Sequence, residues 1–264
     1  MISKKLQRTW AVTLRYLRQS TRDIVSLADF VCWPLIDIIA WGMTSVWIEQ
    51  SGSGVQHIVV TIVSALVLWQ IVYQSNMDIT NNLLEEFWSQ NLVNLFASPL
   101  TIGEWIGAVM LLGFIKMFFI VLLGSMVAWF LYTFNIFAMG LALIPFAMLL
   151  LMTGWWLGFI TASLIIYGGM RFSWATWFIG ALIAPVIGIY YPVNQLPAFM
   201  QFFAKILPPT YIFEGMRTVI FDHVIPWHYL GISLGLNIFY LTVSIFFFRF
   251  MFEKSRIKGL ARIE

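Results

Sequence analysis

The sequence predicts an all-α integral membrane protein with six transmembrane helices, because of its composition and its apolar runs. Of the 264 residues, 61% are hydrophobic and 10% are charged, whereas soluble domains average about 45–50% apolar and about 25% charged residues. The 24 Phe and 13 Trp residues are typical of a chain that packs in lipid and at its interfaces. We therefore expect a single membrane domain over residues 1–264.

Six apolar segments reach the length of about 20 residues that a bilayer-spanning helix needs. They are residues 27–48, 58–77, 105–132, 137–167, 173–191 and 227–251. Little more than residues 133–135 joins the third to the fourth, which predicts a tight helical hairpin. No small-residue cleavage site follows the first run, so we expect it to remain as an anchor. Small residues four apart, which permit close helix approach, are Gly154/Gly158, Ala184/Gly188 and Gly231/Gly235.

Basic residues predict the orientation of the spans, since Lys and Arg are in excess on the cytoplasmic side. Six of the fifteen precede the first span, five lie at or after the end of the sixth, and Arg171 lies between the fourth and fifth. With six spans these twelve share one side, and only Lys205 and Arg217 fall on the other. Both termini are therefore expected to be cytoplasmic.

Residues 1–22 predict an amphipathic helix at the inner membrane interface. At about 100° per residue, the apolar and basic side chains separate onto two faces. The apolar face holds Leu6, Trp10, Leu14 and Leu17, and the basic face holds Lys4, Arg8, Arg15, Arg18 and Arg22. Such a division is typical of helices that lie in the interface. The alternative is a solvated basic tail that only sets the topology.

Residues 79–99, between the second and third spans, predict a cytosolic helix that contains no Lys or Arg. Glu85 and Glu86 begin it, and Pro99 ends it because the ring disfavours helix in the residue before it. Its apolar residues recur at helical spacing and are Leu83, Leu84, Phe87, Leu92, Leu95 and Phe96. Exposed apolar residues on a cytosolic helix favour a protein partner. The alternative is a helix packed on its own membrane domain.

Residues 192–226, between the fifth and sixth spans, are expected to lie outside. The stretch is too polar and proline-broken to span, yet too apolar for an ordinary aqueous loop. We predict two short helices, 196–207 and 211–221, split by Pro208 and Pro209, that dip into the outer leaflet and return. Backbone at that depth must face protein or a water-filled cavity, so the pair would plug the outer mouth of a pathway. Glu214 and Arg217, three residues apart, are expected to pair.

Two ionisable residues lie well inside predicted spans, where each alone would cost about 2.5–3.5 kcal/mol. Asp37 of the first span and Lys116 of the third lie at matching depths, at about 15–17 Å from the inner edge at 1.5 Å per residue. We predict that they pair, either within one subunit or across a dimer. Three roles remain open: a static pair that holds helices in register, a pair that senses substrate or gates, and no pairing.

Four aromatic residues of the first two spans are candidates for a substrate path. They are Trp33, Trp41, Trp69 and Tyr73. Their rings could stack on an amphipathic or sugar-bearing substrate. The alternative is that they face lipid or anchor the helices at the interface.

Motifs of nucleotide binding and catalysis are missing from the sequence. It contains no Walker A loop, no GxSxG, no HExxH and no CxxC. Cys32 is the single cysteine, which excludes an internal disulfide. The spacing of Asp222, His223 and His228, like that of His57, matches no strong metal template. We expect no catalytic residue, no bound metal or cofactor, and no nucleic-acid partner.

The order of these segments resembles the membrane subunit of type-2 (ABC-2) ATP-binding-cassette exporters. That order is a basic interfacial helix, two spans, a cytosolic helix that closes with "FASPLT", three spans, an external proline-rich segment, a last span and a basic tail. The most specific match lies within "YPVNQLPAFMQFFAKILPPTYIFEGMR". Its matching residues are Pro192, Leu196, Pro197, Pro208, Tyr211, Glu214 and Arg217. The cytosolic helix departs from the family, which often has a basic residue there.

The resemblance implies a paired permease driven by another protein. Two copies of the chain would form the path, and two copies of a separate ATPase subunit, which binds ATP and Mg, would sit below them in a bacterial inner membrane. Residues 82–97 would be the coupling helix that fits the ATPase. Its contact residues would be Leu84, Glu85, Glu86, Phe87, Leu92, Phe96 and Pro99. Residues 1–22 would form a gate helix, and the seven external residues would form the outer gate.

The sequence thus predicts a permease that exports an amphipathic, lipid-linked or drug-like substrate, and that is not itself an enzyme. One alternative is an ion-coupled carrier or channel that uses Asp37 and Lys116. A second is a membrane-embedded enzyme that modifies lipid. That enzyme needs a cluster of acid, base or metal-binding residues at one membrane face, and the sequence suggests none.

Overall fold

The computed structural model describes residues 2–51, 57–91 and 98–258, and every regular element within these ranges is a helix. The long helices are α1 (Ile2–Arg22), α2 (Ile24–Gln50), α3 (Ile58–Trp88), α5 (Ile102–Tyr132), α6 (Leu143–Gly168) and α10 (Trp227–Lys258). The shorter helices are η1 (Ile136–Ala142), η2 (Gly169–Phe172), α7 (Ala175–Ile183), η3 (Val193–Gln195), α8 (Ala198–Ile206) and α9 (Pro208–Asp222). The all-α prediction is confirmed for the described chain.

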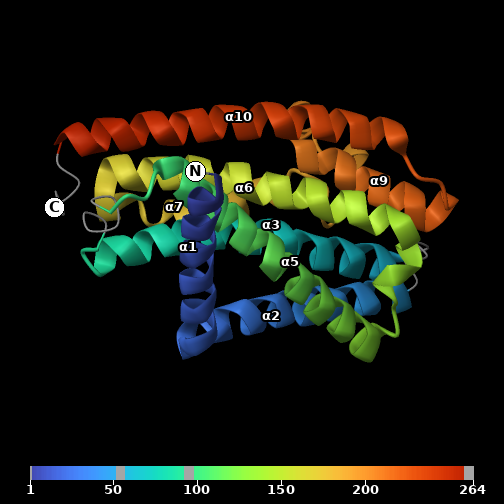
Figure 1. Cartoon of the computed structure of the whole chain (residues 1–264). Coiled ribbons are helices and arrows are strands. Elements are labelled where there is room, and N and C mark those ends of the chain that lie inside the picture. The colour runs from blue at the N-terminus through green and yellow to red at the C-terminus, as the bar shows by residue number, and fades with distance from the viewer. Residues whose placement is uncertain (1, 52–56, 92–97, 259–264) are drawn as a thin grey trace.

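Five of the described helices, α2, α3, α5, α6 and α10, are long and apolar enough to cross a membrane. In Figure 1, α2, α3, α6 and α10 run roughly along one direction, α5 is inclined to them, and α1 crosses the bundle steeply. A bundle of this kind, with apolar side chains on its outer surface, is that of a membrane-embedded, multi-pass protein.

The predicted fifth span, residues 173–191, does not form a sixth long helix. Helix α7 has nine residues and ends at Ile183. Pro185 comes two residues later, after Ala184, and its nitrogen cannot donate the hydrogen bond that would continue the helix. Gly188 then takes a φ of +81°, a left-handed conformation that suits glycine. Residues 173–191 therefore do not form one continuous helix, and hydropathy does not register a break made by one proline and one glycine.

The chain nevertheless runs the length of the bundle between α6 and α10. In Figure 1, α6 ends toward the left of the view and α10 begins at the right. Helix α7 contacts α6 and α3, and α9 contacts α6 and α10. Residues 169–226 therefore make this passage in short pieces instead of one helix.

Helix α3 is the centre of the bundle, because α2, α5, α6 and α7 all contact it. The main apolar core gathers around α3 and α6. Helices α2 and α10 are much less buried by the rest of the chain. In a membrane, their apolar outer faces contact lipid or another chain.

Glycines let α6 approach α3 closely, as one of the small-residue pairs predicts. A Cβ on Gly154 would lie 2.5 Å from the Ser75 Cβ, and one on Gly158 would lie 2.9 Å from the Ile79 Cδ1. The pair Gly231/Gly235 is different, since a Cβ on either residue meets nothing within 4 Å in the described chain. Only part of the small-residue pattern therefore marks helix contacts within this chain.

The segment predicted as a separate cytosolic helix, 79–99, begins as a continuation of α3. Helix α3 runs without a break to Trp88, so Glu85 and Glu86 do not start a new helix. The sequence has no glycine or proline between Met77 and Trp88 that would interrupt the helix. Leu92 and Phe96, with the rest of residues 92–97, lie outside the described residues.

The proline-rich segment contains the two short helices that its sequence predicts, with shifted bounds. Helix α8 ends at Ile206, and α9 begins at Pro208 instead of Tyr211. Leu207 between them is extended, as expected for a residue that precedes proline. Pro208 and Pro209 occupy the first turn of α9. Backbone N–H groups in a first turn have no carbonyl partner within the helix, so the N–H that proline lacks costs no hydrogen bond there.

Candidate functional site

Helix α1 has three faces, where the sequence predicted two. Thr13 and Tyr16 are buried against the bundle, and the Thr13 hydroxyl donates to the Ala108 carbonyl of α5 over 3.2 Å. Leu6 and Trp10 of the predicted apolar face are exposed, 65% and 48% respectively. These side chains point away from the protein, as an interfacial helix requires. The predicted helix is confirmed, and its inward face is a polar one.

Glu86 of α3 is the buried centre of a polar cluster that holds α1. Its carboxylate pairs with the Arg15 guanidinium and accepts from the Tyr16 hydroxyl (3.1 Å) and the Asn91 amide (2.7 Å). The Trp105 indole in turn donates to the Tyr16 oxygen over 2.9 Å. The pKa of Tyr16 is raised, mainly by burial of the side chain and next by the negative charge of Glu86. The hydroxyl therefore keeps the proton that it donates to Glu86.

A second ion pair fastens α1 to the start of α5. The Arg8 guanidinium lies 2.6 Å from the Glu104 carboxylate. Glu104 also accepts from the Thr101 backbone N–H over 2.8 Å, and the Thr101 side chain accepts from the Glu104 N–H. This reciprocal capping box fixes the first turn of α5. Two arginines of the predicted basic face are thus engaged with neighbouring helices.

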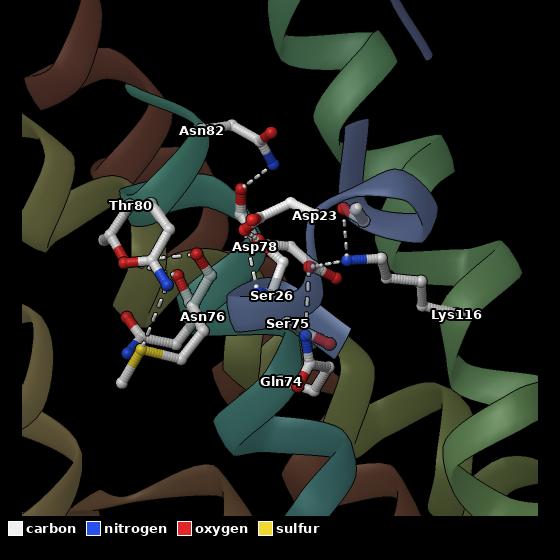
Figure 2. Close-up of polar contacts among 12 residues, drawn as sticks. Asp23, Ser26, Gln74, Ser75, Asn76, Asp78, Thr80, Asn82 and Lys116 are labelled. Atoms are coloured by element: carbon white, nitrogen blue, oxygen red, sulfur yellow. Dashed lines mark hydrogen bonds and ion pairs between the residues drawn. The ribbon is translucent and has the colours of Figure 1, made fainter. Parts of the chain in front are cut away.

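Lys116 pairs with Asp78 of α3, and not with Asp37 as the sequence predicts. The Lys116 Nζ lies 2.6 Å from Asp78 Oδ1 and 3.0 Å from the Ser20 hydroxyl, and Figure 2 shows this contact between α5 and α3. The Gln74 amide also donates to Asp78 Oδ1. Sequence reasoning missed Asp78 because it ended the second span at residue 77, and α3 in fact continues.

Asp37 has a different partner on the neighbouring helix. The Gln70 Nε2 of α3 donates to Asp37 Oδ2 over 3.1 Å. An intrachain pair between Asp37 and Lys116 is therefore a wrong prediction. Helix α3 nevertheless supplies a polar partner to each of the two residues. Similar predicted depths of Asp37 and Lys116 could not select the partner of either residue.

A polar cavity of about 60 Å³ opens where the first half of α2, the second half of α3 and the middle of α5 meet α7 and the end of α1. Its lining contains the acidic residues Asp29, Asp78 and Glu85 and the single basic residue Lys116. Aromatic side chains form part of the wall, and they are Phe30, Trp33, Tyr73 and Trp177. The remaining lining is mostly amide and hydroxyl side chains.

Two of the four candidate path residues, Trp33 and Tyr73, line this cavity together. Each ring lies near Trp177 of α7, with centroids 6.1 Å and 6.2 Å away. Trp41 lies further along α2, where its ring contacts Tyr190 at 4.5 Å. Trp69 is 5% exposed and belongs to the apolar core, so it lines no path in this structure. Trp177 is a partner that sequence analysis missed.

The predicted coupling residues divide into buried and exposed ones. Leu84, Glu86 and Phe87 are buried within this chain, which agrees with the alternative that this segment packs on its own membrane domain. Glu85 and Pro99 are exposed. Trp88, which no sequence motif singled out, is 64% exposed at the end of α3. A partner can reach this end of α3 only through the exposed side chains.

The predicted pair between Glu214 and Arg217 forms, over 3.2 Å. The Glu214 carboxylate also accepts from the Val193 backbone N–H, and Arg217 donates to the Gly188 carbonyl. Burial lowers the pKa of Arg217, and the Glu214 charge opposes that shift. The pair thus ties α9 to the turns that follow α7.

Other residues of the predicted outer gate shape the same region. Pro192 and Pro197 precede η3 and α8, and Leu196 is buried between them. The Tyr211 hydroxyl donates to the Lys205 carbonyl over 2.7 Å, which connects α9 to α8. The Pro208 carbonyl accepts from the Ser233 hydroxyl of α10 over 3.0 Å.

Histidines and acidic residues are too dispersed to form a metal centre in the described ranges. No group of three or more His, Cys, Asp or Glu side chains there could hold a metal ion. His57 and His223 both line an apolar pocket at the end of the bundle where α3 begins and α9 ends, and the Phe221 ring lies 6.3 Å from that of His57. Its other lining residues are apolar, which does not suit a cation.

Comparison of the sequence with models of known protein families gives no match, and comparison with curated proteins gives none. The class of this protein therefore follows from its own structure. Five long apolar helices, a crossing amphipathic helix and polar groups buried between helices define a multi-pass helical membrane protein.

Proposed function

We propose that this chain is the membrane subunit of an ATP-binding-cassette exporter, which moves an amphipathic, lipid-linked or drug-like substrate out of the cytoplasm. In this proposal the chain crosses the membrane six times, with residues 173–191 as a broken fifth crossing and both termini inside. Two copies form the path. A separate subunit, also in two copies, binds and hydrolyses ATP with Mg, so the chain itself is not an enzyme.

The observation that carries the proposal is the connection of α1, α3 and α5 by ion pairs whose carboxylates are buried. Glu86 near the end of α3 and Glu104 at the start of α5 each bind an arginine of α1. In Figure 1, α3 continues past α1 toward the left end of the bundle. A force applied to the end of α3 would therefore reach α1 and α5 through these contacts. A permease driven from outside its own chain needs such a connection.

The contact with the ATPase is proposed to run through Glu85, Trp88 and the residues up to Pro99. Leu84, Glu86 and Phe87 are occupied inside the chain, so they hold the end of α3 in place and do not contact the partner. Large aromatic side chains at the centre of a contact commonly dominate its binding energy. Trp88 is the exposed aromatic residue in this position.

The outer closure is proposed to use α8 and α9 as a re-entrant pair. Most exposed side chains of α8 are apolar, as a helix in the outer leaflet requires, and they include Phe199, Phe202 and Phe203. Lys205, in the last turn, is the exposed charged residue of this helix. Glu214 and Arg217 hold α9 to the turns after α7. These turns and the two helices would shift together when the path opens.

An experiment on the exposed end of α3 tests the proposal. We expect that Glu85→Ala with Trp88→Ala lowers the ATP hydrolysis that co-purifies with the tagged chain by about tenfold, since contact hot spots contribute about 2 kcal/mol or more. The measurement is ATP turnover per mole of chain after affinity capture in mild detergent. The matched control is Trp174→Ala, another exposed tryptophan, which follows the end of α6 and should leave the activity unchanged.

A transport assay with this chain alone gives the outcome that would contradict the proposal. If vesicles that contain only this chain export a substrate without any nucleotide-hydrolysing subunit, the exporter proposal is wrong. An ion-coupled carrier would then be the better description, and it draws on one observation. Asp37 is an acid inside a spanning helix whose hydrogen bond comes from the neutral Gln70. Transport by such a carrier would stop when ionophores collapse the ion gradients.

A further inference from the structure

We propose that the cavity between α2, α3 and α7 binds an organic cation, the ammonium head group of an amphiphile. The proposed site consists only of residues of this chain. Its role in export rests on the proposed function and names the class of substrate that the path would take.

The aromatic wall suits a positive charge. Trp33 and Tyr73 both lie beside Trp177, with ring centroids 6.1 Å and 6.2 Å from it. The faces of Trp and Tyr rings attract ammonium groups, most strongly when water is excluded. Trp33 and Trp177 are 43% and 45% exposed, so neither ring is committed to the core. The rings come from three different helices and meet only in the folded chain.

The charge of the lining favours a cation. The lining contains one ammonium group, that of Lys116, and three carboxyl groups, those of Asp29, Asp78 and Glu85. Lys116 binds Asp78 through Oδ1 and leaves the other oxygen, Oδ2, without a hydrogen bond from any described residue. Asp78 is 4% exposed and lines the cavity. An unsatisfied carboxylate oxygen at such a depth is costly unless a donor reaches it.

The observations favour an ammonium group over a metal ion and over a sugar. The acidic residues of the described chain form no group that could hold a metal. A sugar also stacks on tryptophan and its hydroxyls can donate to carboxylates, but it is neutral and so lacks the charge–charge attraction that an ammonium gains. The cavity of about 60 Å³ accommodates a small head group, and the tail of an amphiphile would leave through its open mouth.

The same pattern continues along α2. Asp29, Trp33, Asp37 and Trp41 are spaced by four residues, so they follow one face of the helix. Trp41 contacts Tyr190, and Asp37 faces α3 through Gln70. Carboxylate and indole thus alternate along this face beyond the cavity, which offers a cation successive sites along the path.

Four octyl compounds with the same tail and different heads test the proposal. The purified chain in lipid nanodiscs is titrated by calorimetry with octylammonium, 1-octanol, octyl glucoside and octanoate, and empty nanodiscs give the background. We expect octylammonium to bind at least tenfold more tightly than the other three. The substitution Trp33→Leu or Trp177→Leu should weaken octylammonium by about 3- to 30-fold, and Asp29→Asn by about two- to fivefold.

Trp47→Leu is the matched control, because Trp47 lies on the same helix, is 68% exposed and does not line the cavity. It should leave the octylammonium affinity within twofold. Equal binding of octanol or octyl glucoside would overturn the proposal, the latter in favour of a sugar site. So would an octylammonium affinity that Trp33→Leu and Trp177→Leu leave unchanged. Because no ATPase is present, these results are independent of the test of the exporter proposal.

Discussion

At the scale of single residues, the structure separates polar groups that hold helices together from those that remain available. Lys116, Asp78, Glu86 and Glu104 are all buried and all paired. Asp37 is bound by an amide only. The available groups therefore lie along α2 and include the Oδ2 of Asp78 on α3, whereas the ion pairs join α1, α3 and α5.

The pair between Lys116 and Asp78 should be the most costly of these contacts to break. We expect Lys116→Met to lower the free energy of unfolding by about 3–5 kcal/mol, because it leaves a buried carboxylate without its counter-charge. The measurement is unfolding of the purified chain in mixed micelles. Lys116→Met with Asp78→Asn should recover most of the loss. The double substitution Lys116→Asp with Asp37→Lys should recover none of the lost free energy of unfolding. A recovery by this exchange would refute the pairing seen in the structure.

At the scale of elements, the side chains of α1 make two kinds of contact, some with the surroundings and some with the bundle. Leu6 and Trp10 face outward, as amphipathicity predicts, whereas Leu17 packs against a buried apolar cluster. The small polar and tyrosine side chains of α1 face the bundle, where the hydrogen bonds of Thr13, Tyr16 and Ser20 are made. A two-face division of the helical wheel could not reveal this third face, because polar residues that bind protein and those that bind water look alike in sequence.

The contact between α3 and α6 can be tested through its glycines. Gly154→Val should lower the free energy of unfolding by about 1–3 kcal/mol, because the new side chain would meet Ser75 and the Val72 carbonyl in a tightly packed contact. Gly231→Val is the control, since a Cβ there meets no described residue within 4 Å. Its effect on the same measurement should stay below about 0.5 kcal/mol. Equal effects of the two substitutions would mean that α3 and α6 do not approach closely.

At the scale of the whole molecule, two ends of the bundle have different chemistry. One end gathers α1, the end of α3, the start of α5 and most of the basic residues. The other holds α9 and the turn before α10. The excess of Lys and Arg at the first end agrees with a cytoplasmic position.

Cysteine labelling tests this orientation. In a Cys32→Ala background, Gln195→Cys should react with a membrane-impermeant maleimide in intact cells, because residue 195 is exposed in the segment expected outside. Arg18→Cys on α1 is also exposed and should react only after the cells are permeabilised. The reverse labelling pattern would invert the proposed topology and remove α3 from the reach of a cytosolic ATPase.

The sequence by itself determined the membrane class, the long apolar helices, the helical α1, the two short helices around Pro208 and the pair of Glu214 with Arg217. These features depend on local properties, namely hydropathy, proline chemistry and a spacing of three residues on one helix. Only the tertiary structure decided that α3 continues to Trp88 and that Lys116 binds Asp78. It alone also brought Trp33, Tyr73 and Trp177 around one cavity. Partners on different helices depend on how those helices pack and in which register, and a single sequence does not encode that in any local pattern.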